Sequence, residues 1–474
     1  MTTSDSNSAE IGLIGLGTMG ANLAMNIAEK GFRIAVFNRT LARKDEFYAS
    51  AGELTDQIVP TDSLEQLVKA IKPPRAIILM VPAGDAVDQQ IAALRPLLDK
   101  DDLIIDAGNA NFHDTNRRAA EAEAAGVPFV GMGVSGGEEG ARHGPSIMGG
   151  GPKPAWDRVA PILEAISAKY EGVPCATWMG EGGAGHFVKA VHNGIEYADM
   201  QMIAEVYGIM RDGFGMDAGR IGSVFEKWNK GTLKSYLIEI SARVSNAKDT
   251  KTGAPILDVI LDKAGQKGTG RWTVIEAQHL GAPITAIDAA VAARNLSSRL
   301  EERKAGEAIF GAAPQALSTE ALSTDSLEMA LIAGKIVCYA QGFQLLRTAS
   351  ENFGWSLPLP DVARVWREGC IIRSTMLNDM AEALTENADL NLMFAPYFSA
   401  KLSETEGSLR RVVSTAALNG LPLPALSNAL SYFDMMRTSR STANMIQGQR
   451  DFFGAHSFER LDSSGSHHGP WKQD

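Results

Sequence analysis

Short apolar runs alternate with helical patterns along the first part of the chain. After an apolar run that ends just before Gly15, further runs occur at residues 33–37, 76–82, 103–109 and 128–137. Runs of this length, bounded by glycine, proline or polar residues, are typical of buried strands. Their alternation with helices predicts a parallel sheet that binds ligands at the carboxyl ends of its strands. We expect this α/β domain of the Rossmann type to cover residues 1–179.

A different pattern begins at about Gly180. Strand-like runs disappear, and long amphipathic patterns with few breakers continue to about Met436. These patterns predict a large all-α domain over residues 180–438. The remaining residues, 439–474, are polar and rich in glycine but contain Phe452 and Phe453. We therefore expect a tail that docks onto another surface, such as a partner subunit.

The segment KAVHNGIEY, residues 189–197, places polar side chains where a helix normally has its core. These side chains share one helical face, because they lie at i, i+3, i+4, i+7 and i+8: Lys189, His192, Asn193, Glu196 and Tyr197. The residues that follow are apolar enough for the helix to be packed inside a domain, where lysine and glutamate are rarely buried without partners. We interpret the segment as a working site. The alternative is the solvated face of a surface helix.

A faint internal repeat supports the first interpretation. The dipeptide FG at Phe214 and Phe353 is followed by WNKG from Trp228 and by WREG from Trp366. At this offset the polar residues correspond to ordinary core residues, His192, Asn193 and Tyr197 to Leu331, Ile332 and Ile336. At these positions the second copy therefore has apolar residues that suit a core, and the first copy has polar residues.

Length, charge and cysteine content narrow the possible classes. A chain of 474 residues is too long for one core and predicts two or three domains. The net charge of −11 argues against non-specific binding to nucleic acid or to a membrane surface. The three cysteines are widely separated and lack metal-ligand spacing. Without a targeting pattern or a run of about 18 apolar residues, a cytoplasmic location is expected.

The first apolar run leads into a GxGxxG motif made by Gly15, Gly17 and Gly20. The motif follows a strand and precedes a helix, and a second strand comes after the helix as in a βαβ unit. This context indicates a dinucleotide site rather than a simple glycine turn. We expect the first glycine to allow the turn, the second to admit the pyrophosphate and the third to permit close helix packing. The amino terminus of the helix would then face the phosphates.

The residues at the end of the second strand favour NADP over NAD. Chains selective for NAD usually place an acid there on the ribose 2′-hydroxyl, whereas this chain has Asn38, Arg39 and Thr40. Arginine pairs with a 2′-phosphate that an acid would repel. The alternative is that Arg39 is a solvated loop residue.

Other polar residues at strand ends and in loops are candidates for substrate contacts. Asn109 and the turn Ser135-Gly136-Gly137 are expected at strand ends, where side chains and backbone N–H groups suit a carboxylate. Ordinary turns are the alternative. Further along, isolated cationic and polar clusters would suit a phosphate if the fold gathers them, although each alone is more typical of surface charge: Lys267 with Thr269, Arg294, and Arg450 with His456.

Six motifs together resemble those of the 6-phosphogluconate dehydrogenase family. They are GLGTMGANLAMN, NRT, GVSGGEEGARHGPSIM, GHFVKAVHNGIEYADMQ, QKGTGRWT and QRDFFGAH, in the family's order and spread over essentially the whole chain. The resemblance implies an NADP-dependent oxidative decarboxylation of 6-phosphogluconate to ribulose 5-phosphate and carbon dioxide, without a metal. It also implies a homodimer in which the tail of one subunit completes the site of the other.

The resemblance assigns roles to individual residues. Lys189 is expected to act as the general base and to return its proton during decarboxylation, and Glu196 as the acid that protonates the first carbon of the enediol. Residues expected around the substrate's carboxylate and hydroxyls are Asn109, Ser135, Gly136, Gly137, His192 and Asn193. Those expected around its phosphate are Tyr197, Lys267, Thr269, Arg294, Arg450 and His456. The cofactor residues are Gly15, Leu16, Gly17, Thr18, Met19, Gly20, Asn38, Arg39, Thr40, Val81, Pro82, Ala83 and Asn109.

The chain departs from the family pattern beside the cofactor. Pro82 stands where many members carry lysine, and Ala107 and Ala110 replace a glycine and a polar residue. These changes bear on the strength of NADP preference and not on the reaction type. Two other functions remain open at this point: a dehydrogenase of small unphosphorylated β-hydroxy acids, and a catalytically silent NADP-binding protein.

Overall fold

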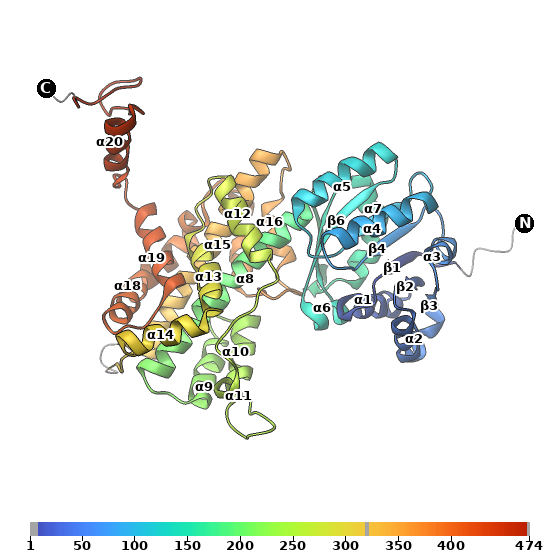
Figure 1. The fold of residues 1–474 in the computed structure, drawn as a ribbon, viewed down its shortest axis with the longest axis horizontal. Coiled ribbons are helices and arrows are strands. Elements are labelled where there is room, and N and C mark those ends of the chain that lie inside the picture. Colours follow the sequence, from blue (N-terminus) through green and yellow to red (C-terminus); the bar gives the residue numbers. More distant parts are fainter. Residues whose placement is uncertain (1–7, 318–321, 472–474) are drawn as a thin grey trace, which may run out of the picture.

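The computed structural model describes residues 8–317 and 322–471. Figure 1 shows two bodies side by side, a sheet flanked by helices and a larger body built from helices, with the last helix projecting away from both. The sheet ends with strand β10 at Gly180, and helix α8 begins at Ala184. The expected fold class, a Rossmann-type domain followed by a large helical domain, is confirmed.

The sheet has eight strands in the order β10-β7-β6-β5-β4-β1-β2-β3. Their bounds are β1 Ile11–Ile14, β2 Ile34–Phe37, β3 Ile58–Pro60, β4 Ala76–Leu79, β5 Leu103–Asp106, β6 Phe129–Ser135, β7 Ser146–Gly150 and β10 Ala176–Gly180. The five expected strands are all present. These five strands pair parallel, as expected. The sheet continues with two strands that were not expected: β7 pairs antiparallel with β6, and β10 pairs parallel with β7. A separate hairpin joins β8 (Lys169–Tyr170) to β9 (Val173–Pro174).

The register of the parallel strands brings four loops to one edge of the sheet. Ile14 pairs with Phe37 on one side and with Leu79 on the other, and Leu79 pairs with Asp106. The loops that follow these strands therefore start side by side, as expected for a dinucleotide site. The helices around the sheet are α1 Thr18–Glu29, α2 Leu41–Ser50, α3 Leu64–Ala70, α4 Asp85–Leu94, α5 Phe112–Ala125, α6 Gly137–His143 and α7 Lys153–Ile166.

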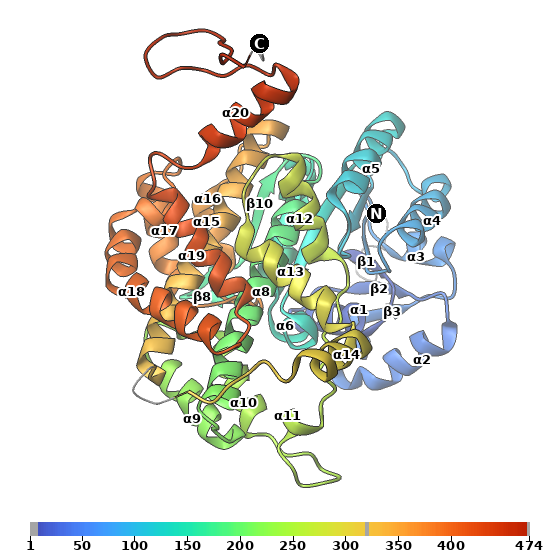
Figure 2. The same ribbon diagram turned by 60° about the vertical axis from the view of Figure 1, so that its left-hand side comes forward.

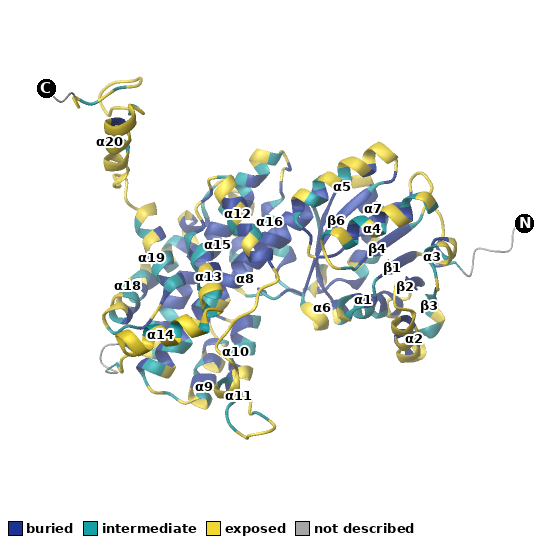
Figure 3. Cartoon of the chain, viewed as in Figure 1, coloured by how far each residue is buried: buried dark blue, intermediate teal, exposed yellow. Residues whose placement is uncertain are grey.

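The helical domain is built around two long helices, α8 (Ala184–Gly208) and α15 (Thr324–Phe353), which pack against each other. The other helices are α9 Ala218–Trp228, α10 Tyr236–Asn246, α11 Ile256–Val259, α12 Thr269–His279, α13 Thr285–Ser297, α14 Leu300–Phe310, α16 Leu359–Val365, α17 Met376–Glu386, α18 Pro396–Leu418, α19 Pro424–Met436 and α20 Ala443–Gly454. By length and mean hydropathy helix α15 could cross a membrane, but 89% of its apolar window is buried inside the protein, as in the core helix of a globular domain. Figure 3 shows this buried centre.

The expected internal repeat has a structural counterpart. Each copy contains a long helix, then a short helix that ends beside a fully buried tryptophan, Trp228 or Trp366, and then a further helix. The two copies join through a reciprocal pair of hydrogen bonds around Ser235 and Ser374. The N–H of Tyr236 donates to the carbonyl of Arg373 at 3.0 Å, and the N–H of Thr375 donates to the carbonyl of Lys234 at 3.1 Å.

Helix α8 lies close against the sheet of the first domain because glycines remove the side chains between them. A methyl group on Gly131 of β6 would lie 2.8 Å from Nδ1 of His186 on α8, and one on Gly185 of α8 would lie 2.5 Å from the carbonyl oxygen of Met148. A methyl group on Gly133 would lie 2.4 Å from Cβ of Lys189. The amino-terminal half of α8 thus belongs to the packing of both domains (Figure 2).

Candidate active site

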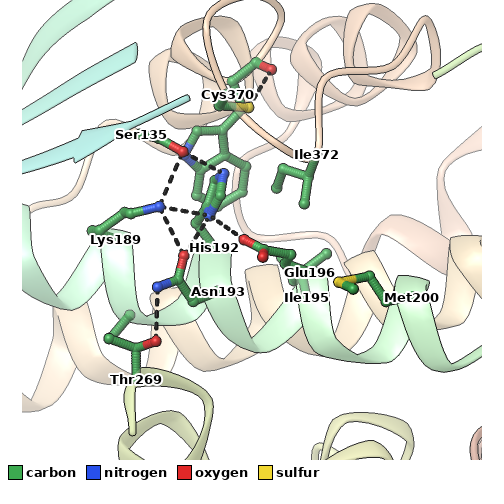
Figure 4. Close-up of polar contacts among 12 residues, drawn as sticks. Ser135, Lys189, His192, Asn193, Ile195, Glu196, Met200, Thr269, Cys370 and Ile372 are labelled. Carbon is green, nitrogen blue, oxygen red and sulfur yellow. Dashed lines mark hydrogen bonds and ion pairs between the residues drawn. The ribbon is translucent and has the colours of Figure 1, made fainter. Parts of the chain in front are cut away.

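The polar face of α8 forms a buried cluster at the junction of the two domains (Figure 4). Lys189 is 6% exposed, His192 is fully buried and Asn193 is 8% exposed. Ser135, from the end of β6, faces them from the sheet and is also buried. The alternative of a solvated surface face is therefore excluded.

The amine of Lys189 is held by neutral oxygen atoms. It donates to Oδ1 of Asn193 at 2.7 Å and to Oγ of Ser135 at 3.0 Å, and it lies 3.3 Å from Nδ1 of His192. Burial lowers the pKa of Lys189 from its usual range, while the charge of Glu196 opposes that shift. Because desolvation disfavours the ammonium form, this lysine can release its proton more readily than a surface lysine.

His192 and Glu196 extend the cluster along the same face. Nδ1 of His192 lies 3.8 Å from Oε2 of Glu196, and its Nε2 lies 3.3 Å from Oγ of Ser135. Burial and the nearby amine of Lys189 place the pKa of His192 well below its usual range, so the ring is neutral. Burial raises the pKa of Glu196, which favours the protonated carboxyl that a general acid requires.

Two further contacts connect α8 to the helices that follow it. Nδ2 of Asn193 donates to Oγ1 of Thr269, the first residue of α12, at 2.8 Å. The guanidinium of Arg294, on α13, lies 3.7 Å from the centre of the Tyr197 ring. The fold therefore brings Thr269 and Arg294, which are 25 residues apart in sequence, to the polar face, at Asn193 and at Tyr197.

The structure does not bring every expected substrate residue into this cluster. Lys267 is exposed in the loop before α12, and Asn109 is exposed in the loop after β5. Gly136 and Gly137 follow Ser135 directly, at the start of α6. The remaining pair, Arg450 and His456, lies at the projecting helix α20, away from the cluster of the same chain (Figures 1 and 2).

A cavity of about 340 Å³ lies at the edge of the sheet where the loops after the parallel strands meet. Its lining includes the expected Gly15, Gly17, Asn38, Arg39, Thr40, Val81 and Pro82, together with Arg43, Gln89 and Gln90. A methyl group on Gly20 would lie 1.9 Å from the carbonyl oxygen of Gly15, whereas one on Gly17 would meet nothing within 4 Å. Close packing at Gly20 and open space at Gly17 are the features that a dinucleotide's pyrophosphate requires. The residues therefore fit a nicotinamide dinucleotide.

Sequence reasoning missed several residues around these two sites. Trp366 packs its ring 5.7 Å from that of His192, and Arg43 adds a second cation beside Arg39. Arg118, 2% exposed, donates to both carboxylate oxygens of Asp88 and to the carbonyl of Gly84, and so fixes the loop after β4. The alternating glycines of the segment GMG at residues 131–133 were a usable signal for close helix packing. Arg118 gave no comparable signal in the sequence, because an arginine in an amphipathic helical pattern normally lies on the exposed face.

Comparison with known proteins identifies the family. Residues 10–180 match the NAD binding domain of 6-phosphogluconate dehydrogenase, and residues 185–471 match the family's C-terminal domain. The chain belongs to the 6-phosphogluconate dehydrogenase family. Two similar family members from Bacillus subtilis use different cofactors. The NADP(+)-dependent, decarboxylating enzyme is 48% identical to this chain, over 98% of this chain and 99% of its own length. The NAD(+)-dependent enzyme is 47% identical over the same shares.

A solved structure of a family member has the same fold throughout. It is the Plasmodium falciparum 6-phosphogluconate dehydrogenase, described in its apo form and in complex with its cofactor NADP+ and its substrate 6-phosphogluconate. The two chains are 42% identical with a TM-score of 0.93, and the match covers 98% of this chain and 100% of that one. The family architecture therefore applies to the whole of this chain.

Proposed function

We propose that the chain oxidises and decarboxylates 6-phosphogluconate to ribulose 5-phosphate and carbon dioxide, with NADP as the oxidant. The observation that carries the proposal is the buried amine of Lys189, held by neutral partners between the dinucleotide edge of the sheet and the helical domain. Such an amine can accept a proton from a hydroxyl group near neutral pH, which a solvated lysine cannot do.

Lys189 and Glu196 divide the proton transfers between them. NADP, when bound, supplies an acceptor for the hydride that leaves the third carbon of the substrate. Lys189 takes the proton of the hydroxyl on that carbon, which gives a β-keto acid. It then returns this proton to the new carbonyl oxygen as carbon dioxide leaves, and the product is an enediol. Glu196, whose raised pKa favours the protonated carboxyl, gives a proton to the first carbon, while the hydroxyl on the neighbouring carbon returns its proton to Lys189, which completes the ketose.

The other members of the cluster fit the two charged ends of this substrate. Ser135, His192 and Asn193 surround the amine of Lys189 and would hold the carboxylate and hydroxyls at reacting distance. Arg294, with Tyr197 and Thr269, would bind the phosphate, and Lys267, Asn109, Gly136 and Gly137 would join them when substrate is present. Arginine suits this role because its guanidinium can bind phosphate through two parallel hydrogen bonds.

We assign Arg450 and His456 to the site of a partner subunit. Their helix projects from the body of its own chain, and Phe452 and Phe453 beside them are 58% and 72% exposed. Exposed aromatic side chains of this kind are typical of a segment that docks. A homodimer with exchanged tails would cover them. Truncation before Arg450 should then raise KM for 6-phosphogluconate steeply while sparing cofactor binding, whereas an unchanged KM would remove the tail from the site.

NADP preference is assigned to Arg39. It lines the dinucleotide cavity with Arg43 at the end of β2, where the 2′-phosphate would lie. Replacing Arg39 with alanine should raise KM for NADP at least tenfold and leave KM for NAD nearly unchanged. A wild-type enzyme that prefers NAD would overturn the assignment.

A direct assay tests the reaction itself. Absorbance of the reduced nicotinamide should rise with 6-phosphogluconate, and carbon dioxide should be released in equal amount. Activity on a small unphosphorylated β-hydroxy acid instead, or no activity on either, would support one of the two rival functions. We place the enzyme in the cytoplasm, in keeping with three free, buried cysteines.

A further inference from the structure

Another cavity, of about 290 Å³, lies where the two copies of the internal repeat join. It shares no residue with the catalytic cluster or with the dinucleotide cavity. Its walls come from the hairpin of the first domain and from both copies of the repeat: Tyr170, Asn229, Lys234, Ser235, Tyr236, Glu239, Arg367, Glu368, Arg373, Ser374 and Thr375. We call it the junction cavity.

The junction cavity has an excess of positive charge. Glu368 pairs with Arg373 at 3.0 Å, and Glu239 pairs at 2.6 Å with Arg243, a residue outside the lining. Lys234 and Arg367 have no carboxylate within ion-pair distance in the described part of the chain. Two cations that face one cavity without a counter-ion favour an anionic occupant.

The arginines are held in place and keep donors free. The Arg367 guanidinium lies 4.3 Å from the centre of the Tyr170 ring, and that of Arg373 lies 3.9 Å from the Tyr236 ring. The Tyr170 hydroxyl in turn accepts a hydrogen bond from Nδ2 of Asn378 at 2.8 Å. Among residues 8–317 and 322–471, Arg367 donates only through Nε, to the carbonyl of Arg364 at 3.2 Å, and its terminal N–H groups have no partner there.

Two more features of the junction cavity point to an anion. The hydroxyl oxygen of Ser374 is buried beside the hydroxyl of Tyr339 and makes no hydrogen bond of normal geometry with the described residues. Helices α10 and α17 both begin here, at Tyr236 and Met376, and the amino terminus of a helix favours negative charge. A buried unpaired hydroxyl normally has a ligand or a water molecule as partner.

We propose that the junction cavity is a second anion site, which binds the phosphate or carboxylate group of a small metabolite. Its volume fits one oxyanion with a few carbon atoms, since pockets for larger ligands occupy roughly 300 to 1,000 Å³. Lys234 and Arg367 would bind the oxyanion directly, and Ser374 would donate its hydroxyl proton. This site is separate from the one proposed for the substrate phosphate.

The segment from Trp366 to Thr375 connects the junction cavity to the catalytic cluster. Arg367, Arg373 and Ser374 face the cavity, whereas Trp366 packs on the ring of His192. The carbonyl of Gly369 accepts a hydrogen bond from the N–H of Ser146 at 2.9 Å. It also lies where a methyl group on Gly136 would be only 2.5 Å away. An anion that holds this segment would therefore act on the packing around His192 and Ser135.

Equilibrium dialysis with radiolabelled inorganic phosphate tests the site in the full-length enzyme. We expect two phosphates per chain in the wild type and one in Lys234→Gln combined with Arg367→Ala. The Arg294→Ala variant should also keep one, at the junction cavity. A matched control, Lys227→Gln, changes an exposed lysine on α9 and should keep two. The single change Lys234→Gln alters only an exposed residue and should by itself weaken the second phosphate at least fivefold.

The outcomes separate this inference from the proposed function, on which it does not depend. A wild-type enzyme with one phosphate that only Arg294→Ala removes would overturn the junction site. A phosphate count unaffected by Arg294→Ala would instead count against the substrate site. Acetate in place of phosphate tells which oxyanion the cavity prefers. If phosphate inhibits only by competition with 6-phosphogluconate, and equally in wild type and Lys234→Gln, the connection to catalysis is refuted.

Discussion

Gly133 on β6 and Lys189 on α8 are in such close contact that a methyl group on the glycine would lie 2.4 Å from Cβ of the lysine. The sheet thus sets the position of the base through the absence of a side chain. Gly133→Ala should push Lys189 away from Ser135 and Asn193 and lower kcat about 100-fold, the usual effect of a misplacement near 1 Å. The matched control is Gly208→Ala, because Gly208 ends the same helix with nothing within 4 Å of an added methyl group. Equal rates in the two variants would contradict this account.

The pH dependence should be bell-shaped, because the base must be neutral and the acid protonated. As pH falls through the lowered pKa of Lys189 the amine gains a proton, so kcat/KM should fall on the acidic side. As pH rises through the raised pKa of Glu196 the acid loses its proton, so the rate should also fall on the alkaline side. Glu196→Gln should lose about 100-fold or more in kcat and keep only the acidic limb. An alkaline limb that survives in Glu196→Gln as it does in the control Glu121→Gln would assign this limb to another group.

Stability should also depend on pH, through Glu205 of α8. Its carboxylate accepts hydrogen bonds from the N–H groups of Ala425 and Leu426 at the start of α19, and burial raises its pKa to about 7. The folded state holds this proton up to a higher pH than the unfolded state, whose value is 4.5. The stabilisation of the folded state is therefore complete below pH 4.5 and is lost as pH rises to 7. The amount lost is about 3 kcal/mol, because each unit of pKa difference contributes about 1.36 kcal/mol.

Glu205→Gln measures this contribution. The free energy of unfolding should be measured with urea at pH 5 and at pH 8. Relative to the wild type, that of the variant should rise by about 3 kcal/mol from pH 5 to pH 8. Glu404→Gln on α18 changes an exposed glutamate and should show no such gain. A constant difference between wild type and Glu205→Gln across this range would refute the role of Glu205.

Asp451 should organise the tail that carries Arg450 and His456. It is 2% exposed and accepts hydrogen bonds from the N–H groups of Ser457 and Gly469 at 2.8 and 2.9 Å, and from Nδ1 of His468 at 2.7 Å. Without these bonds the loop after α20 loses its shape. Asp451→Asn should therefore raise KM for 6-phosphogluconate about tenfold with KM for NADP unchanged. Asp462→Asn, which removes an exposed pair with Arg460, is the control. Identical constants in both variants would show that the tail holds its shape without Asp451.

The sequence predicted the elements better than their arrangement. Periodicity located the five strands of the dinucleotide domain and the change to helices near Gly180, because each pattern reflects local burial. It could not show that β7 turns back antiparallel, since direction depends on pairing partners and not on local pattern. The short β3, β7 and β10 were themselves missed, because runs of three to five residues carry little periodicity.

For the site, the sequence predicted the polar face of α8 but not what surrounds it. Spacing alone places Lys189, His192 and Asn193 on one face, whereas their burial depends on glycines in β6 that close the gap between the domains. Trp366 lies 174 residues from His192 in sequence and packs on it only through the repeat. Contacts of this range leave no local signal, and the family motifs, not periodicity, suggested the gathering of Thr269 and Arg294.

The central claim is that Lys189 is a weakly basic amine, and titration of this lysine tests it most directly. In enzyme labelled at the lysine ε-carbons, the NMR resonance that disappears in Lys189→Met identifies the residue, and circular dichroism verifies that the variant stays folded. We predict that this resonance titrates below the value of about 10.4 for free lysine, and that Lys189→Met loses at least about 1,000-fold in turnover. A resonance that titrates at or above the value of free lysine, or a variant with near-normal turnover, would contradict the account.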